Sequence, residues 1–432
     1  RLEKTYQEMR RGGSFMELPA KREVFYSLRE KDALKAKTAA YVHEVTGFPV
    51  WQGTEATYFP LGKDMFPVLL KELREAKHFI FMEYFMIKKG FMWDSILEIL
   101  EEKAAQGVDV RIIYDHWGCV ITLPLKFEET LRAKGIACEV FNPFPLIVNA
   151  IYNKRDHRKI CVIDGRVGFT GGINLCDEYI GKYIRFGEWK DTALMLKGEA
   201  VWNLTACFLQ VWQVVRNQPA PIPLEEFGPR RLGQGEEVVA EGEENGSADE
   251  GYFLPFGDYC PLDAEAVSQN VYLNVLSQAQ RYVYICTPYL IIDDEMMNAL
   301  CRTAQSGVDV RIMTPGIPDK KLVFMVTQSY YPKLLRSGVK IYSYQPGFLH
   351  AKSFVSDDNC VVLGTINLDY RSLYLDLEDG VWLYDSPVVK DVKEDFLRTL
   401  QVCKEVTLEE CLHKNVLVRT MQNMFRLFAP MF

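Results

Sequence analysis

The stretch HRKICVID, residues 157–164, has a counterpart in HAKSFVSD, residues 350–357. In each stretch a lysine stands two residues after a histidine, and an aspartate stands seven residues after it. Side chains two apart on a β-strand point to the same face, so each histidine shares a face with its lysine. In a chain with six histidines, one chance match to H-x-K-x4-D has a probability of roughly a few per cent. Two matches, each followed by G-x-x-N, indicate a functional site rather than two ordinary buried strands.

These stretches belong to a duplication that covers most of the chain. AQGVDVRII at 105–113 returns as QSGVDVRIM at 305–313, and AKHFIFMEYF at 76–85 resembles AQRYVYICTPY at 279–289. The matching segments lie about 200 residues apart. The chain therefore consists of two related halves rather than a longer array of repeats.

Each half alternates predicted strands and helices. HFIFMEYF at 78–85 is a short apolar run that predicts a strand, and residues 93–106 carry apolar side chains at helical spacing. We expect this helix to end at Gly107 and its counterpart to end at Gly307, just before the next strand. Strand–helix–strand units of this length predict right-handed crossovers, and hence an α/β fold with mostly parallel sheets.

The composition limits the class of protein. A chain of 432 residues, 48% hydrophobic and 25% charged, fits a globular protein of two or three domains. The net charge of −8 disfavours a nucleic-acid-binding protein, although a basic surplus can be local. Eleven cysteines without zinc-type spacing favour a reducing, intracellular setting and no structural metal. No run of about 18 apolar residues predicts a membrane span, but the start at Arg1 leaves room for an upstream anchor.

The chain divides into four parts. These are an N-terminal segment at 1–50, a first repeat at 51–217, an acidic glycine-rich linker at 218–252, and a second repeat at 253–432. The first 40 residues hold ten Lys and Arg against six Asp and Glu, which fits either an attraction to an anionic membrane or a solvated helical surface.

The last helix of the second repeat is predicted to be amphipathic. Its apolar face consists of Leu417, Met421, Met424, Phe425 and Phe428. We expect this stripe to pack on the protein's own core, with membrane contact as the alternative.

Both histidine strands are predicted to fold back as β-hairpins through the turn-forming residues that follow them. A two-residue turn in each hairpin would place His157 opposite Asn174 and His350 opposite Asn367. Each half would then bring a histidine, a lysine and an asparagine together.

Such a combination predicts phosphate chemistry. Lys159 and Lys352, with the two amides, would form a compact pocket of hydrogen-bond donors that stabilises a phosphate oxyanion during displacement. A neutral histidine can attack phosphorus to form a phosphohistidine, while a protonated one donates to the leaving oxygen. Water or an alcohol can then resolve the intermediate, and the scheme needs no metal and no cofactor.

Four carboxylates complete the candidate site. The motif aspartates, Asp164 and Asp357, belong to the candidate catalytic set, but their place across the turn from the histidines favours a structural role. A catalytic histidine also needs an acid on its second ring nitrogen. The repeat aligns Asp191 with Glu378, each just before an apolar run.

We assign each of these acids to the histidine of its own half. Asp191 is predicted to orient His157, and Glu378 is predicted to orient His350. The alternative is that both are surface carboxylates.

With these residues in place, the chain resembles the phospholipase D superfamily, and within it the bacterial cardiolipin synthases. Beyond the duplicated H-x-K-x4-D, the resemblance rests on GGINLCDEYIG at 171–181, PGFLHAKSFVSDD at 346–358 and INLDYRSLYLDLE at 366–378. It extends from about Tyr41 to the end of the chain.

The resemblance implies a duplicated phospholipase D-like fold, with two α/β/α sandwich lobes and one active site at their interface. It also implies metal-independent transfer between two phosphatidylglycerol molecules, giving cardiolipin and glycerol. His157 would be the nucleophile and His350 the general acid and then base, although two chemically similar halves leave the order open. The implied setting is the cytoplasmic side of a bacterial membrane, with an anionic surface as partner and no nucleic acid.

Further residues near the predicted site are also candidates. Glu83 and Asp115 end predicted parallel strands, where ligands of α/β sheets commonly bind. Tyr370 and Arg371 follow the second asparagine, and Arg371 is the best candidate to bind a lipid phosphate. Cys176 stands where the family resemblance leads us to expect glycine, and we interpret it as a packing change.

Two other functions use the same residues. A hydrolytic phospholipase D would let water resolve the intermediate, and the shape of the pocket rather than any motif decides between water and an alcohol. A nuclease or other phosphodiesterase of this fold would be expected to show basic residues clustered at the cleft.

Overall fold

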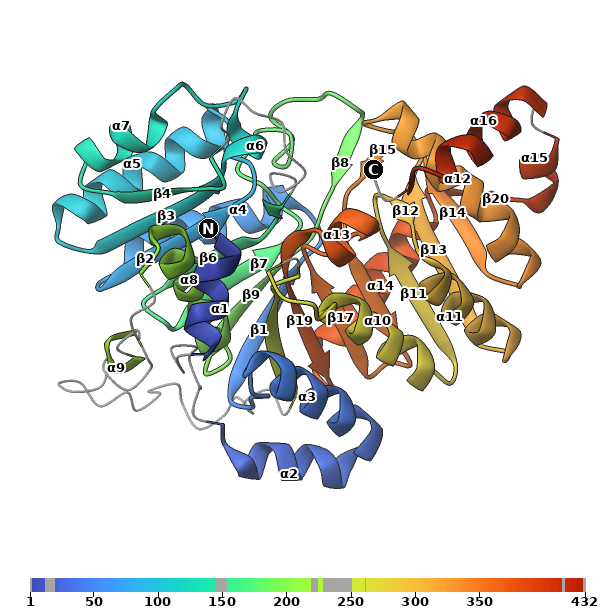
Figure 1. Ribbon diagram of the computed structural model, residues 1–432, viewed down its shortest axis with the longest axis horizontal. Helices are drawn as coiled ribbons and strands as arrows, with labels where there is room; N and C mark the ends of the chain where they lie inside the picture. Colours follow the sequence, from blue (N-terminus) through green and yellow to red (C-terminus); the bar gives the residue numbers. More distant parts are fainter. Residues whose placement is uncertain are drawn as a thin grey trace.

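The computed structural model describes residues 2–11, 20–143, 154–218, 224–227, 251–260, 262–413 and 416–429. Two β-sheets form the centres of two lobes that lie side by side (Figure 1). Most of the predicted linker at 218–252 falls outside the described residues, which include the short helix α9 (Leu224–Phe227).

The first lobe contains a seven-stranded sheet in the order β1-β9-β7-β6-β2-β3-β4. Its strands are β1 (Thr54–Phe59), β2 (Phe79–Tyr84), β3 (Asp109–Asp115), β4 (Ala137–Phe141), β6 (Lys159–Ile163), β7 (Val167–Gly171) and β9 (Ala193–Gly198). Its helices are α4 (Gly62–Glu75), α5 (Phe91–Ala105), α6 (His116–Cys119), α7 (Phe127–Ala133) and α8 (Val201–Arg216). As predicted, α5 ends just before Gly107, whose φ of 90° is a left-handed conformation that glycine adopts without strain.

The second lobe repeats this plan in the order β10-β19-β17-β16-β11-β13-β14-β20. Its strands are β10 (Tyr252–Asp258), β11 (Tyr282–Cys286), β13 (Asp309–Pro315), β14 (Lys340–Tyr344), β16 (Ser353–Ser356), β17 (Cys360–Gly364), β19 (Asp376–Tyr384) and β20 (Cys403–Val406), with a separate pair β12 (Leu290–Ile291) and β18 (Leu368–Asp369). Its helices are α10 (Val267–Gln278), α11 (Asp294–Gln305), α12 (Lys321–Arg336), α13 (Tyr370–Tyr374), α14 (Val388–Leu400), α15 (Leu408–Leu412) and α16 (Val416–Arg426). The helix α11 ends before Gly307, as predicted.

The α/β class and the duplication are confirmed, but the prediction of mostly parallel sheets is wrong. In the first sheet only β2–β3 and β3–β4 are parallel, and in the second only β11–β13, β13–β14 and the short pair of β19 with β5 (Arg155–Asp156). The other neighbours along both sheets are antiparallel. The reason is that each histidine strand belongs to a tight hairpin, which can only be antiparallel, and this hairpin adds to the sheet beside β2 or β11.

Two helices join the lobes into one core. The helix α8 packs on β2, β6 and β7 of its own sheet and also on β10 of the second lobe. Its counterpart α14 packs on β11, β14, β16 and β17, and also on β1 of the first lobe. Because each lobe is packed against a helix of the other, the surface between them is held in one arrangement.

Both histidine hairpins have a turn one residue longer than predicted. Ile163 pairs with Val167 and leaves the loop 164–166 between them. The second hairpin repeats this pairing around the loop 357–359. The two-residue turn is therefore wrong by one residue, because the aspartate that ends each motif takes a left-handed conformation, with φ of 52° in the first hairpin and 54° in the second.

The motif aspartates hold these loops in place. The carboxylate of Asp164 accepts hydrogen bonds of 2.8 Å from the backbone N–H groups of Lys77, His78 and Phe79. In the second lobe, Asp357 accepts from the N–H groups of Gln280, Arg281 and Tyr282, at 2.7, 2.8 and 3.0 Å. Each aspartate thus ties its hairpin to the start of β2 or β11, away from the histidine end. This geometry supports the structural role of both aspartates rather than a catalytic one.

Substitution Asp164→Ala is therefore expected to destabilise the protein rather than disable its chemistry. We expect a loss of about 3 kcal/mol in the free energy of unfolding, because three backbone donors lose a charged acceptor. Denaturant unfolding measures this loss, with Arg166→Ala in the same loop as the control. A folded Asp164→Ala protein with normal stability and a large fall in kcat would contradict the structural role.

The chain ends add helices around the second lobe. The helices α1 (Leu2–Arg11), α2 (Arg22–Lys31) and α3 (Ala33–Thr46) pack partly on this lobe. For example, the Tyr6 hydroxyl donates to Asp263 at 2.7 Å, and the Ser27 hydroxyl lies 2.8 Å from the hydroxyl of Tyr252. These contacts support a structural role for the N-terminal segment.

The C-terminal stripe does not pack as predicted. The helix α16 contacts α12, yet Met421, Met424 and Phe428 are 37%, 47% and 51% exposed. Phe425 is half-buried against the core, and the side chain of Leu417 lies outside the described residues. Core packing is therefore wrong for three members of the stripe, because α16 lies at the edge of the molecule and packs mainly on α12 (Figure 1).

Candidate active site

Two short strand pairs between the lobes position the histidines. In one, β5 (Arg155–Asp156) of the first lobe pairs with the start of β19, and in the other, β15 (Gly347–Leu349) of the second lobe pairs with β8 (Glu188–Lys190). The N–H of His157 donates to the carbonyl of Leu377 at 2.9 Å, and the N–H of His350 donates to that of Lys190 at 2.7 Å. Each histidine therefore lies beside the residue that precedes a carboxylate of the other lobe.

The orienting carboxylates are exchanged between the lobes. Nδ1 of His157 lies 2.9 and 3.0 Å from the two carboxylate oxygens of Glu378. Nδ1 of His350 lies 2.6 Å from Oδ2 of Asp191. The predicted pairs within each half are therefore wrong, although the four residues do meet in one site. The reason is the parallel pairing of β5 with β19 and of β15 with β8, which brings each histidine to the other lobe's acid. With both Nδ1 atoms engaged, each Nε2 is the ring nitrogen available for chemistry.

Both motif lysines are buried beside the histidines. The ammonium groups of Lys159 and Lys352 each donate to the carbonyl of the histidine two residues before, and Nζ of Lys352 lies 2.8 Å from Nδ1 of His350. Burial lowers the pKa of Lys159 to about 8 and that of Lys352 to about 7. Burial and the nearby lysines lower the pKa of His350 to about 4 and that of His157 well below its usual value. Both imidazoles are therefore neutral at neutral pH before an anion binds.

A cavity of about 210 Å³ between the lobes collects the candidate residues. It is lined by both histidines and by Asn174, Asn367 and Arg371. Nδ2 of Asn174 donates to the hydroxyl of Tyr179 at 2.8 Å, while Oδ1 of Asn367 is buried with no hydrogen-bond partner among the described residues. Arg371 forms an ion pair of 2.8 Å with Asp376, which also lines the cavity. The residues predicted to bind phosphate thus lie in one cavity with the histidines.

Sequence reasoning missed the residues that support this arrangement from behind. The Thr365 hydroxyl donates to the carboxylate of Glu378, and Asp379 accepts from the N–H of Lys159 at 3.3 Å. The buried guanidinium of Arg158 donates to the carbonyls of Glu378 and Asp258, at 3.1 and 3.0 Å. The signal that could have found Arg158 and Asp379 is a charge inside an apolar strand, directly next to a motif histidine or its acid.

Three of the four further candidates, Glu83, Asp115 and Tyr370, are not among the residues that line this cavity. Glu83 is fully buried, with Oε1 3.8 Å from the guanidinium of Arg158. Asp115 accepts from the N–H groups of Gly118 and Asp156, both at 3.0 Å, and burial raises its pKa to about 7. The ring of Tyr370 packs near that of Tyr374. Asp115 therefore supports the backbone of β5, Glu83 lies beside the guanidinium of Arg158, and Arg371 alone of the four lines the cavity.

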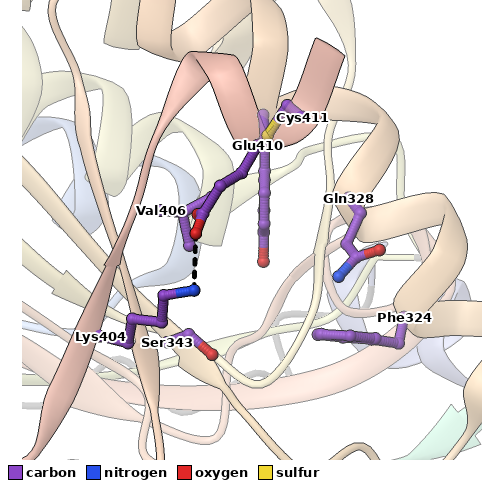
Figure 2. A pocket seen from close by; sticks show the side chains of 8 residues that line it. Phe324, Gln328, Ser343, Lys404, Val406, Glu410 and Cys411 are labelled. Atoms are coloured by element: carbon purple, nitrogen blue, oxygen red, sulfur yellow. Dashed lines mark hydrogen bonds and ion pairs between the residues drawn. The ribbon is translucent and has the colours of Figure 1, made fainter. Parts of the chain in front are cut away.

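A second cavity, of about 310 Å³, lies between α12, β14, β20 and α15 (Figure 2). Its lining residues are Phe324, Gln328, Tyr331, Ser343, Lys404, Val406, Glu410 and Cys411. Its two charged groups neutralise each other, because Lys404 donates to Glu410 at 2.6 Å, as the dashed line in Figure 2 shows. Without a histidine or an unpaired charge among these residues, this cavity offers no comparable chemistry.

Other features bear on the setting of the site. Within the described ranges, no group of three or more His, Cys, Asp or Glu residues is placed to hold a metal ion. Helices long and apolar enough to cross a membrane are likewise absent from the part of the chain that the structure describes. Cys176 is 1% exposed near Asn174, in agreement with a packing role.

Sulfate binding is expected to weaken as pH rises from about 6 to about 9, a range in which sulfate keeps its charge. Burial depresses the pKa of Lys352 to about 7 and that of Lys159 to about 8, so both cations are lost in this range. We expect the affinity for sulfate to fall at least about tenfold over this range, measured as the inhibition constant of sulfate for catalytic turnover. In Lys352→Met the remaining decline should centre near pH 8, and an affinity independent of pH would contradict this assignment.

Comparison with known proteins agrees with the division into two related lobes. The family described as "Cardiolipin synthase, PLD-like domain" matches residues 69–183 and 272–400, one segment in each lobe. The solved phosphatidylserine synthase from Haemophilus influenzae Rd KW20 has a TM-score of 0.66 and 15% sequence identity, and covers 91% of this chain and 97% of its own. This structural likeness shows the fold, which is that of the duplicated phospholipase D-like enzymes.

Relatives with higher sequence identity show which family of enzymes the chain belongs to. A cardiolipin synthase of Geobacillus sp. (strain WCH70) is 36% identical over 395 residues, which is 90% of this chain and 74% of the relative. An uncharacterized protein of Streptococcus mutans serotype c is 45% identical over 408 residues, 94% of this chain and 85% of the relative. The chain belongs to the cardiolipin synthase family. It is an enzyme of the phosphatidyltransferase type.

Proposed function

We propose that this enzyme transfers a phosphatidyl group from one phosphatidylglycerol molecule to another, giving cardiolipin and glycerol. The observation that carries the proposal is the pair of histidines in one cavity, each with Nδ1 held by a carboxylate of the other lobe. This arrangement leaves one Nε2 for nucleophilic attack and the other for proton transfer.

The first step forms a phosphohistidine. The Nε2 lone pair of His157 forms a bond to phosphorus, and the bond from phosphorus to the glycerol headgroup oxygen breaks. The leaving oxygen takes a proton from His350, which gains that proton when the anionic phosphodiester enters and raises its pKa. Glycerol leaves, and the phosphatidyl group remains on His157.

The second step regenerates the enzyme. His350 takes a proton from a glycerol hydroxyl of the second phosphatidylglycerol, whose oxygen then attacks phosphorus. The nitrogen–phosphorus bond breaks and returns its electron pair to His157. Water in place of the lipid alcohol would give phosphatidic acid, which is the reaction of a hydrolytic phospholipase D and the alternative function.

The charges of the cavity support both steps. Asn174, Asn367 and Arg371 of the cavity lining, with Lys159 and Lys352 buried directly behind the histidines, are proposed to stabilise the phosphate oxygens as negative charge develops. No step in this scheme needs a metal ion. The lysines are held by the histidine carbonyls before substrate binds, so the donors need little rearrangement.

The surroundings favour His157 as the nucleophile. Burial and the nearby cations Lys159 and Lys352 hold the pKa of His157 well below its usual value, which keeps this imidazole neutral. The charge of Asp191, and its acceptance of a hydrogen bond from the imidazole, raise the pKa of His350 against the effect of burial, which still lowers it to about 4. A carboxylate that favours the imidazolium form suits His350 for proton transfer.

The substrates define the proposed setting. Phosphatidylglycerol and cardiolipin reside in membranes, so we propose that the enzyme acts at an anionic membrane surface on the cytoplasmic side of a bacterial cell. Nucleic acid is not among the proposed partners, given the net charge of −8.

Lipid analysis after incubation with phosphatidylglycerol vesicles and a chelator tests the proposal. Cardiolipin and free glycerol in equal amounts are expected, with His413→Ala, an exposed histidine outside the cavity, as a matched control. Phosphatidic acid as the main product would replace the synthase by a hydrolytic phospholipase D. No turnover of this lipid would exclude both functions for the chain as tested.

A further inference from the structure

The exposed apolar side chains of the protein are concentrated in four segments. Twelve of the sixteen large apolar side chains that are exposed among the described residues lie in 116–126, 181–187, 316–323 and 420–428, which we call the apolar rim. These twelve are Trp117, Val120, Ile121, Leu125, Tyr183, Ile184, Ile317, Leu322, Met421, Met424, Leu427 and Phe428. Such a concentration indicates an interaction surface, because exposed apolar residues on soluble surfaces are normally scattered.

The exposure is close to complete at the tips of these segments. Ile121 is 92% exposed, Leu125 is 91% exposed, Leu427 is 80% exposed and Ile184 is 75% exposed. Covering such an exposed apolar side chain with any apolar phase lowers the free energy of the system. The rim therefore has a strong tendency to leave water.

Three of the rim segments border the active-site cavity. Val323, in segment 316–323, lines the cavity, and segment 181–187 lies between the lining residues Tyr179 and Trp189. The Trp117 ring lies 5.4 Å from the guanidinium of Arg155, whose strand partner Asp376 also lines the cavity.

The fourth segment packs on the helix that continues from the third segment. The guanidinium of Arg426 lies 4.3 Å from the ring centroid of Tyr330 on α12, the helix that begins within segment 316–323. In Figure 1, α6, the stretch leading into β8, α12 and α16 lie along the upper side of the molecule, whereas α2 and α3 lie at the lower side. The rim therefore surrounds one side of the cavity.

The charge of the rim is opposite to that of the whole chain. The four segments contain six basic residues, Lys126, Lys182, Arg185, Lys320, Lys321 and Arg426, and one acidic residue, Asp319. The complete chain has a net charge of −8. Basic side chains among exposed apolar ones are attracted to anionic lipid headgroups at the depth where the apolar side chains enter the bilayer.

We propose that the apolar rim inserts into the surface of a bilayer containing anionic phospholipid, so that the cavity opens directly onto the lipids. This inference rests on the proposed function in that it assumes lipid substrates. A bilayer fits better than a protein partner because lysine is depleted at protein–protein interfaces, whereas four of the six basic residues of the rim are lysines. The rim thereby takes the membrane-binding role that the sequence offered to the N-terminal segment.

Vesicle flotation tests this inference. We would use vesicles of phosphatidylglycerol and phosphatidylcholine in equal parts, compared with phosphatidylcholine alone. The double variant Ile121→Glu/Leu125→Glu and the single variant Ile184→Glu are each expected to reduce binding to the anionic vesicles at least about tenfold. Leu34→Glu, on α3 and 48% exposed, is the matched control and should bind as the wild type does.

Several results would overturn the inference. These are wild-type protein that fails to float with the anionic vesicles, rim variants that bind as tightly as Leu34→Glu, or equal binding to phosphatidylcholine alone. Self-association that the rim variants abolish, without any vesicle binding, would assign the rim to a second copy of the chain instead.

Two controls separate this inference from folding and from the proposed function. The rim variants should keep the wild-type unfolding temperature and the wild-type rate on short-chain phosphatidylglycerol dispersed below its micelle concentration. If the wild type binds vesicles through the rim but forms no cardiolipin, the proposed function fails and the docking surface stands. If cardiolipin forms and the rim variants act normally on vesicles, the docking surface alone fails.

Discussion

Replacement of His157 by alanine is expected to reduce cardiolipin formation by at least about 10⁴-fold in kcat. The imidazole of His157 is neutral, buried and held at Nδ1 by Glu378, so no other described group in the cavity is placed to take its role in attack on phosphorus. Product analysis with phosphatidylglycerol vesicles measures the loss. A variant within about tenfold of the wild type would contradict a phosphohistidine on this residue.

A phosphodiester with a p-nitrophenolate leaving group separates the roles of the two histidines. This group departs without a proton, so His350→Ala should still release up to one equivalent of p-nitrophenol and then stop, because its second step lacks a base. The stalled protein should carry acid-labile, base-stable phosphate. His157→Ala should release none, and the reverse pattern would exchange the two roles.

Substitution of an orienting carboxylate is expected to have the next largest effect. Asp191→Asn should lower kcat roughly 10³-fold with little change in KM, because His350 loses the carboxylate that aligns its ring and stabilises the imidazolium form. Steady-state kinetics on phosphatidylglycerol vesicles measure this loss. A rise in KM alone would indicate that Asp191 acts in substrate binding instead.

The exchange of carboxylates can be tested in the His350→Ala background with the p-nitrophenyl substrate. Only the chemistry of His157 contributes to the burst there, so Glu378→Gln should slow the burst and Asp191→Asn should leave it unchanged. If Asp191→Asn slowed the burst in this background, the result would support the alternative in which each carboxylate orients the histidine of its own half.

Much of this site could be predicted from sequence because each motif occurs in both halves, which makes a chance match improbable. The spacing of His157 with Lys159, and the same spacing in the second half, identified the reacting groups and placed the two halves in one enzyme. The ends of the helices at Gly107 and Gly307 were also predictable, since the left-handed termination is a local property of glycine.

The remaining features depend on contacts that no local pattern reports. The alignment of the two halves correctly matched Asp191 with Glu378. However, it fits equally well whether each histidine bonds the acid of its own half or the acid of the other half. Only the parallel strand pairs between the lobes distinguish the two. The prediction of mostly parallel sheets failed for a similar reason. The hairpin that pairs beside β2 does not change the strand–helix–strand pattern that precedes it in the sequence.

The exchanged carboxylates also bear on how such a chain could have arisen. A histidine from each half that meets an acid from the other is the arrangement that a two-fold axis imposes on a dimer of identical subunits. The equivalent bonds from His157 to the Leu377 carbonyl and from His350 to the Lys190 carbonyl preserve that symmetry in a single polypeptide. A single lobe of this kind would reach a complete active site only by self-association. In a chain with two lobes the partnership is permanent, and the two histidines are free to differ in role.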